Sequence, residues 1–277
     1  MIGRDDPRLR DRDGLGRKLA EAARLSAAVL LGKRAACEVK LKQDGSPVSS
    51  ADLAADHAAK VALARLLPDF PIVSEETVGS VVPGAVFILL DPLDGTREFL
   101  AGGNSYCVAI AVVSEGRPIA GAIAAPEMGR LWFAGEHAYV QDFAPDGSAL
   151  SDARPVAVRD LPEEGPVALI SRFHGDGRSD GMTAAVCCSK GIPLSSAVKF
   201  CIIASGEADL HVRCGQTMEW DIAAGDAILS AAGGIVLTLD GARPHYGVAE
   251  RQFRNPPFVA ASSEALARRA IAGDTGC

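Results

Sequence analysis

The sequence predicts an α/β (α+β) protein built in layers, and three observations carry this prediction. In the second half of the 277-residue chain, apolar strand-like segments alternate with helical segments, which is typical of a layered α/β unit. The first half combines amphipathic helices with short apolar strands separated by turns. Apolar residues make up 48% of the chain and charged residues 23%, so it can bury a large core without disulfides or metals as staples.

The elements of the first half follow from local patterns. Leucine and alanine recur at helical spacing near the start, Ser50 is expected to cap a second helix, and Pro68 lies just beyond its end. A continuous apolar run before Asp91 indicates a strand buried on both faces. In order, we expect helices at 15–31 and 50–67, strands at 71–74 and 85–91, and antiparallel strands with three turns over 106–142.

A change of composition divides the chain. Residues 142–166 are rich in Pro, Gly, Asp and Ser, which is typical of a boundary. We therefore predict an α+β part at 1–150 and an α/β part at 151–277. In the second part we expect strands at 167–171, 208–212, 234–239 and 257–262, and helices at 181–190, 195–206 and 221–233.

Charge and apolar patterning exclude several classes of protein. The formal net charge of −7 argues against a globally basic nucleic-acid binder. The longest apolar run is too short to cross a membrane, and the first 18 residues mix charges of both signs without an apolar core. We expect no integral membrane segment and a cytoplasmic location, with peripheral attachment to the inner membrane left open. Seven scattered cysteines without a CxxC pair indicate reduced thiols.

Acidic residues gather where predicted strands end. Asp91 ends the buried strand, Pro92 keeps the chain extended, and Asp94 follows beside the start of a short helix. Two carboxylates so close repel each other unless a cation neutralises them, and the free N–H groups of a helix start bind phosphate. The plain structural alternative is a helix cap with a structural aspartate.

Further acids occupy similar positions. Glu75 and Glu76 end another short strand, while Asp52 and Asp221 lie in first turns of predicted helices. The helix dipole alone explains either Asp52 or Asp221, since it stabilises an acid in the first turn by about 0.3–1 kcal/mol. The whole set is improbable by chance, and hard carboxylate oxygens suit Mg²⁺. The sequence therefore predicts a site for divalent metal and phosphate.

Three signatures carry a family resemblance. DPLDGT, WDIAAG and SEET resemble signatures of the inositol monophosphatase superfamily of Mg²⁺-dependent, lithium-sensitive phosphatases, over residues 15–270. The resemblance implies a layered α-β-α-β-α sandwich. Within the superfamily, DPLDGTREF, SRFH and SSAVKFC are most similar to the 3′(2′),5′-bisphosphate nucleotidase branch. Ser74 replaces the usual glycine and Asp226 the usual histidine or asparagine; we expect such departures to affect the nucleotide side more than the metal side.

The resemblance also implies roles for individual residues. Two or three Mg²⁺ ions are expected, the first on Glu75, Asp91 and the carbonyl of Leu93, the second on Asp91, Asp94 and Asp221. Glu75 and the pair of Thr96 with Asp52 are expected to activate the attacking water, and the N–H groups of Gly95 and Thr96 to hold the scissile phosphate. The nucleotide is expected to contact His174, Ser196, Lys199 and Arg213. Ser196 and Lys199, three residues apart, would reach one phosphate from one face of a helix turn.

The implied reaction is hydrolysis of the 3′-phosphate of adenosine 3′,5′-bisphosphate (PAP) to AMP and phosphate in sulfur assimilation, with its phosphosulfate form (PAPS) as an open second substrate. Inositol monophosphate or fructose 1,6-bisphosphate, cleaved by the same metal chemistry, are the alternatives. Two remote alternatives remain. One is a serine hydrolase that uses Ser179 of GRSDG with Asp209 or Asp240 and His245. The other is a ligand-binding protein without catalytic activity. We expect a small phosphorylated partner, no nucleic acid, and a monomer or homodimer.

Overall fold

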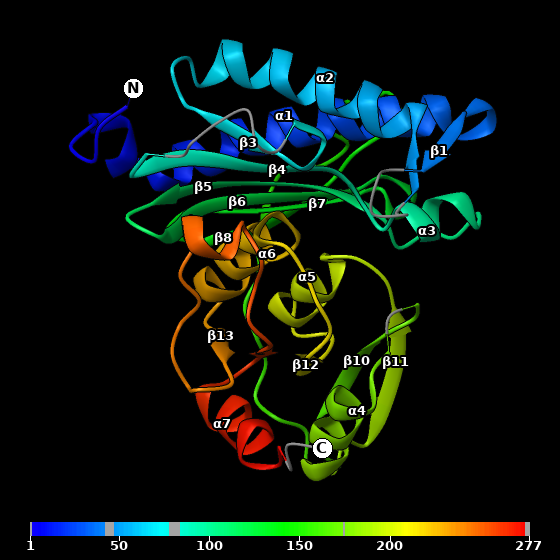
Figure 1. Ribbon diagram of the computed structural model, residues 1–277, viewed down its shortest axis with the longest axis vertical. Helices are drawn as coiled ribbons and strands as arrows, with labels where there is room; N and C mark the ends of the chain where they lie inside the picture. The colour runs from blue at the N-terminus through cyan, green and yellow to red at the C-terminus, as the bar shows by residue number, and fades with distance from the viewer. Residues whose placement is uncertain (1, 42–46, 78–83, 174, 275–277) are drawn as a thin grey trace.

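Five layers build the protein, as the computed structural model shows for residues 2–41, 47–77, 84–173 and 175–274 (Figure 1). Helices α1 and α2 cover one face of a seven-stranded sheet, and α5 and α6 fill the space between this sheet and a five-stranded one. Helices α4 and α7 cover the outer face of the second sheet. The predicted α-β-α-β-α sandwich is thus confirmed. The bounds are α1 Arg12–Lys33, α2 Ser50–Leu66, α3 Thr96–Leu100, α4 Gly177–Ala185, α5 Val198–Ala204, α6 Glu219–Ala231 and α7 Glu264–Ala272.

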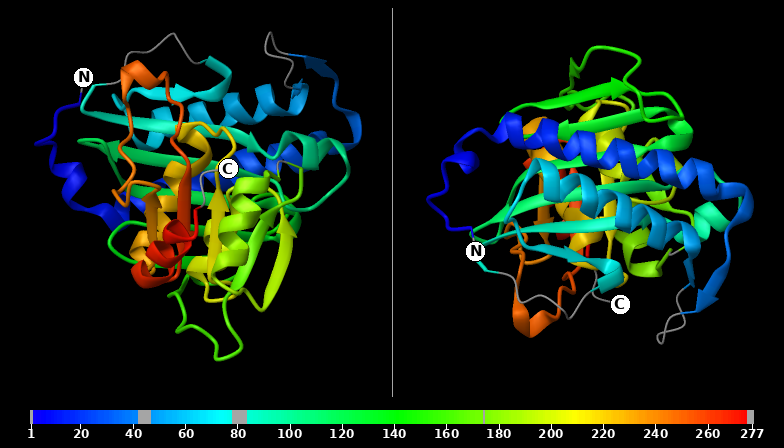
Figure 2. Two further views of the ribbon diagram at one scale, coloured as in Figure 1. Left: turned by 60° about the horizontal axis from the view of Figure 1, so that its bottom comes forward. Right: turned by 90° about the horizontal axis from the view of Figure 1, so that it is seen from above.

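The seven-stranded sheet has the strand order β3-β4-β5-β6-β7-β8-β9, with β3 parallel to β4 and the other neighbours antiparallel. Strand β4 is buried on both faces, as its apolar run predicted: Ile88 and Leu90 pack with α1 and α2, whereas Phe87 and Leu89 pack with α5 and α6. From above, α1 and α2 lie side by side across the sheet (Figure 2). The bounds are β3 Ile72–Ser74, β4 Val86–Asp94, β5 Cys107–Ser114, β6 Arg117–Ala125, β7 Arg130–Ala134, β8 Ala138–Asp142 and β9 Arg154–Pro155.

The five-stranded sheet has the order β11-β10-β12-β14-β13. Its residues alternate between the two cores, because Val259 packs toward α4 and α7 while Phe258 and Ala260 pack toward α5 and α6. A separate hairpin pairs β1 (Val39–Leu41) with β2 (Pro47–Ser49). The bounds are β10 Val167–Ser171, β11 Lys190–Leu194, β12 Leu210–Arg213, β13 Ile235–Thr238 and β14 Phe258–Ala261.

The starts of α1, α4, α5 and α6 differ by two to four residues from the predicted ones, and α2 begins as predicted but has another cap. The cap of α2 is Ser49 rather than Ser50: the Ser49 hydroxyl accepts from the N–H of Asp52, and the Asp52 carboxylate accepts from the N–H of Ser49 at 2.8 Å. Helix α4 begins at Gly177, earlier than expected, because Asp176 accepts the N–H of Ser179 at 2.8 Å and caps it. Strands β1, β2, β9 and β11 and helix α7 were not predicted.

Strand β9 lies within the stretch expected to form the boundary and pairs with β8 of the first sheet. The division at residue 150 stays a prediction. Six cysteines lie in the described part of the chain, and all six are free thiols. In that same part, no helix combines the length and the apolar character needed to cross a bilayer.

Gly121 lets strand β6 approach helix α6. A Cβ atom at this position would lie 2.7 Å from the backbone carbonyl oxygen of Ala224. We expect Gly121→Val to lower the free energy of unfolding by about 3 kcal/mol, because sheet and helix would have to separate. Urea unfolding measures this change. Gly191→Val is the matched control: its nearest neighbour would be Ile170 at 3.7 Å, and a destabilisation equal to that of Gly121→Val would contradict the explanation.

Candidate active site

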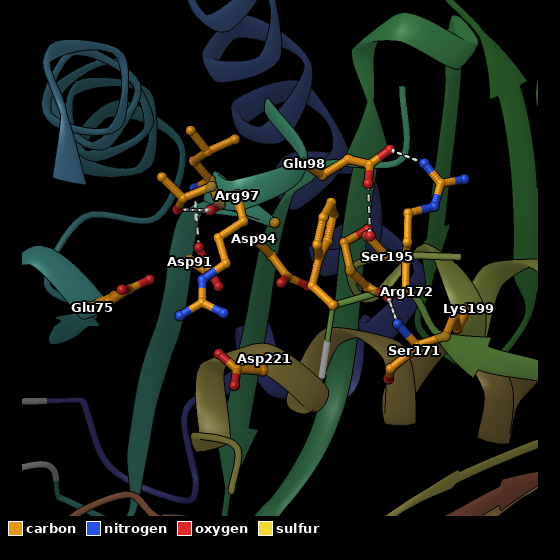
Figure 3. A pocket seen from close by; sticks show the side chains of 15 residues that line it. Glu75, Asp91, Asp94, Arg97, Glu98, Ser171, Arg172, Ser195, Lys199 and Asp221 are labelled. Carbon is orange, nitrogen blue, oxygen red and sulfur yellow. Dashed lines mark hydrogen bonds and ion pairs between the residues drawn. The ribbon is translucent and has the colours of Figure 1, made fainter. Parts of the chain in front are cut away.

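Two adjoining hollows of about 230 and 330 Å³ form one cleft beside the carboxyl ends of β3 and β4. The cleft lies between the first sheet and the α5–α6 layer, and part of it is shown in Figure 3. We call Glu75, Asp91, Asp94 and Asp221 the acidic region of the cleft, and Lys199 and Arg213 its basic region. The side chains of Arg97, Arg172 and Glu98 also line the first hollow, and Arg97 lies among the acids (Figure 3). The residues that line both hollows are Glu75, Asp94, Ser171, Ser196, Lys199 and Asp221.

Different elements bring the acids to the cleft. Asp91 and Asp94 leave the end of β4, where the pairing with β5 shifts register, and the N–H of Leu93 donates to Asp91 Oδ1 at 3.0 Å. Asp221 lies in the first turn of α6, where its Oδ2 accepts from the N–H of Met218 at 2.7 Å. Glu75 opens a 3₁₀ turn after β3 and points toward the same space (Figure 3). The structure therefore brings the predicted acids together.

The negative charges of the acids repel one another, and this repulsion raises pKa values. Burial raises the pKa of Asp91 well above its usual value, and the charges of Glu75, Asp94 and Asp221 raise it further. Burial and the charge of Asp94 likewise raise the pKa of Asp221, and burial raises that of Asp94, although Lys199 opposes this shift. A bound cation would remove this repulsion.

The donor set suits a hard divalent cation. It consists of carboxylate oxygens, which Mg²⁺ prefers, without histidine or thiolate. Within the described ranges, however, no three His, Cys, Asp or Glu side chains converge closely enough to hold one ion as they stand. The acids thus share a cleft, and their side chains would have to move to close around a metal.

The raised pKa values predict a pH dependence. The folded protein binds protons on Asp91, Asp94 and Asp221 at pH values where the unfolded chain has released them, so stability without metal should rise as the pH falls from 8 toward 6.5. Below this range the lowered pKa of buried His211 acts in the opposite direction. Melting temperatures in EDTA measure this rise. Saturating Mg²⁺ should flatten the dependence; a metal-free protein that becomes less stable over the same range would contradict it.

Thr96 and Gly95 form the turn between β4 and α3. Gly95 has φ = 95°, a conformation that side-chain-bearing residues rarely adopt. The Thr96 hydroxyl lies 3.3 Å from Asp52 Oδ1 and 3.2 Å from the carbonyl oxygen of Leu93. The predicted contact between Thr96 and Asp52 is therefore present.

Lys199 and Arg213 form the basic region of the cleft, in addition to Arg97 and Arg172, which line the first hollow. Lys199, in α5, donates to the carbonyl oxygens of Ser196 at 2.8 Å and Leu194 at 3.3 Å, and burial lowers its pKa to about 8. Arg213 ends β12 and is 9% exposed. Ser196 lines the cleft but precedes α5 with φ = 60°, so its expected place on a helix face is wrong. His174 lies outside the described residues.

A group of polar residues in the cleft was not predicted. Arg172 Nη1 donates to Glu98 Oε1 at 2.8 Å, and the Ser195 hydroxyl donates to Glu98 Oε2 at 2.9 Å (Figure 3). This ion pair joins the segment after β10 to α3. Glu98 belongs to the segment DGTREF and Arg172 to the segment SRFH. Because 74 residues separate them, no local pattern in the sequence predicts their contact.

Asp226 and Ser74, the two residues that depart from the family pattern, lie in different parts of the structure. Asp226 accepts hydrogen bonds from Tyr246 at 2.8 Å and Ser230 at 3.1 Å, and it is absent from the described lining of the cleft. Asp226 therefore does not contact the described cleft directly, and its effect on the nucleotide side stays a prediction. Ser74 is fully buried and contacts Asp56 of α2.

The serine-hydrolase alternative is wrong. The Ser179 hydroxyl donates to Asp176 at the start of α4, and Asp209 is buried in an ion pair with Arg159. His245 and Asp240 line a different cavity, so no catalytic triad forms around Ser179.

The fold and this cleft define a class: the chain belongs to the inositol monophosphatase family, whose model matches residues 14–273. It is 35% identical over 231 residues to the 3′(2′),5′-bisphosphate nucleotidase CysQ of Salmonella typhimurium, covering 80% of this chain and 87% of that one. The CysQ of Buchnera aphidicola is 33% identical over 249 residues, with coverages of 88% and 91%.

Solved structures agree. The crystal structure of CysQ from Bacteroides thetaiotaomicron matches with a TM-score of 0.74 and 26% identity, over 91% of this chain and 97% of that one. An inositol monophosphatase from Thermotoga maritima, 20% identical over 92% and 95% of the two chains, has the same fold with a TM-score of 0.72. The predicted family and the predicted likeness to its bisphosphate nucleotidases are confirmed.

Proposed function

We propose that this protein is a Mg²⁺-dependent phosphomonoesterase that hydrolyses the 3′-phosphate of PAP to AMP and phosphate. The likeness to CysQ nucleotidases supports a phosphatase that acts on bisphosphate nucleotides. The observation that carries the proposal is that the acidic region and the basic region share one cleft. Such a cleft suits a ligand with two phosphates, one beside the acids and one beside Lys199 and Arg213.

The metal would be held by the acidic region. We assign its ligands to the carboxylates and to one backbone carbonyl, in a site for two or three Mg²⁺ ions. When bound, Mg²⁺ lowers the pKa of a water molecule and neutralises phosphate charge. The proposed ligands are Glu75, Asp91, Leu93 through its carbonyl oxygen, Asp94 and Asp221.

Side chains and backbone groups of the protein would orient the attacking water and the phosphate. Asp52 and the carbonyl of Leu93 face the Thr96 hydroxyl as acceptors, which turns an oxygen lone pair of Thr96 toward the cleft. Thr96 and Glu75 can then accept hydrogen bonds from the attacking water, and the N–H groups of Gly95 and Thr96 would hold the phosphate. Hydrolysis of phosphate monoesters requires a barrier reduction on the order of 20 kcal/mol, to which such positioning contributes.

The basic region would hold the 5′-phosphate. Because the pKa of Lys199 is lowered to about 8, most of this amine is protonated at pH 7, and a phosphate beside it would favour the charged form further. Arg213 and the polar groups of Ser196 and His174 are proposed as further contacts. PAPS carries a charged group at the same end and is proposed as a second substrate.

The first test is phosphate release from PAP, inositol 1-phosphate and fructose 1,6-bisphosphate, each with Mg²⁺ and with EDTA. We expect Mg²⁺-dependent release with the highest kcat/KM for PAP. A higher kcat/KM for inositol 1-phosphate or fructose 1,6-bisphosphate would be consistent with the metal chemistry but would reject the nucleotidase activity. Activity that survives EDTA would reject the metal mechanism. The cytoplasmic location and the monomer or homodimer stay predictions from the sequence.

A further inference from the structure

One face of α2 contacts segments of the chain that line the active-site cleft. Asp52, Asp56 and Lys60 are spaced four residues apart, so they form a row on one face of this helix. Asp52 contacts Thr96, as described above. The next two members of the row contact the segment that carries Glu75.

The contacts of Asp56 and Lys60 enclose that segment. The Ser74 hydroxyl donates to Asp56 Oδ1 at 2.5 Å and accepts from the N–H of Glu76 at 3.3 Å. The Lys60 amine donates to Asp56 Oδ2 at 2.7 Å and to the Thr77 hydroxyl at 3.0 Å. A chain of hydrogen bonds therefore ties the residue before Glu75 and the end of its turn to the same helix.

We propose that Ser74, Asp56 and Lys60 are positioning residues that hold Glu75 in place for metal binding. The proposal rests on the metal-binding role given to Glu75 above. None of the three lines the cleft among the residues described there, so they would act through the turn and not by contact with metal or substrate.

The turn depends on such outside contacts. Glu75–Thr77 is a single 3₁₀ turn, and the hydrogen bonds of such turns have poorer geometry than those of an α-helix. The Ser74 hydroxyl is buried and uses both its donor and its acceptor, and both oxygens of Asp56 are engaged. A glycine at position 74, as in the family signature, would remove two of these hydrogen bonds. The Ser74 and Asp56 side chains thus support the strand end that carries the proposed metal ligand.

Mg²⁺ binding to the substrate-free enzyme tests the proposal directly. Isothermal titration and the melting-temperature shift with Mg²⁺ would be compared for wild type, Ser74→Ala and Lys60→Met. We expect Mg²⁺ affinity to fall by about tenfold in each variant, since residues that orient metal ligands have effects of at least this size. Loss of activity should be recovered in part at high Mg²⁺ concentration, with KM for PAP little changed.

Arg65→Met is the matched control, because Arg65 lies on the same helix and pairs with Glu21 at the surface. It should leave Mg²⁺ affinity unchanged. In the double variant of Ser74 and Lys60, the two losses should be less than multiplicative, because both act through Asp56.

Unchanged Mg²⁺ affinity in both folded single variants would overturn the proposal, as would a loss in Arg65→Met of the same size. If Ser74→Ala does not fold, Lys60→Met decides alone, since its partly exposed side chain is not part of the core. A wild-type protein that does not bind Mg²⁺ would instead reject the proposed function.

Discussion

Asp94→Asn is expected to lower kcat for PAP by about a thousandfold while the protein stays folded. Asparagine keeps the shape and the ability to accept the N–H of Ala197, which lies 2.5 Å from Asp94 Oδ2. It removes one full negative charge from the acidic region. Because burial raises the pKa of Asp94, the metal-free variant should melt no lower than wild type.

Steady-state kinetics at saturating Mg²⁺ and melting curves in EDTA measure the two halves of this prediction. Asp226→Asn is the control, because Asp226 is also a buried carboxylate with a raised pKa but lies outside the described lining of the cleft. We expect its kcat to be unchanged. An Asp94→Asn enzyme with nearly normal kcat would remove Asp94 from the metal site.

Lys199→Met is expected to raise KM for PAP by about thirtyfold and to change KM for adenosine 3′-monophosphate little. A hydrogen bond to a charged group contributes about 2 kcal/mol. Adenosine 3′-monophosphate has no 5′-phosphate, so it does not make the hydrogen bond that the substitution removes. Methionine keeps the apolar stem of the buried lysine and removes only its charge and donors.

Initial rates with both nucleotides measure this difference. Lys190→Met, at the exposed start of β11, is the control for loss of a positive charge and should change neither KM. Equal increases for both nucleotides in Lys199→Met would show that Lys199 supports the cleft generally and would end its assignment to the second phosphate.

The site was predictable where its signals are local. A continuous apolar run followed by Asp91 and Pro92 predicts a buried strand that ends in an acid, and β4 has this form. The start of α2 was recognisable within one residue because serine and aspartate form a capping box. Helix α7 carries a similar local signal, since Ser263 caps it and Leu266, Ala267 and Ala270 are buried at helical spacing.

Other features depend on contacts that no local pattern contains. Ser196 has a positive φ, and the N–H of the following residue is held by Asp94 from the first sheet. The ion pair of Glu98 with Arg172 joins segments 74 residues apart. Strand β11 contains Gly191 and Pro193, which disfavour strands, yet it pairs with β10 as an edge strand.

The helical layer between the sheets sets the timing of folding during synthesis. Ten of the thirteen residues of α6 are buried, and this helix contacts strands of both sheets. Its first residue is made 77 residues after the last residue of β8, from 142 to 219. At about 5–20 residues per second, the ribosome needs roughly 4–15 s to supply it. During this interval Phe87, Leu89 and Trp132 lack the cover that α6 provides, so we expect the nascent chain to depend on holding chaperones.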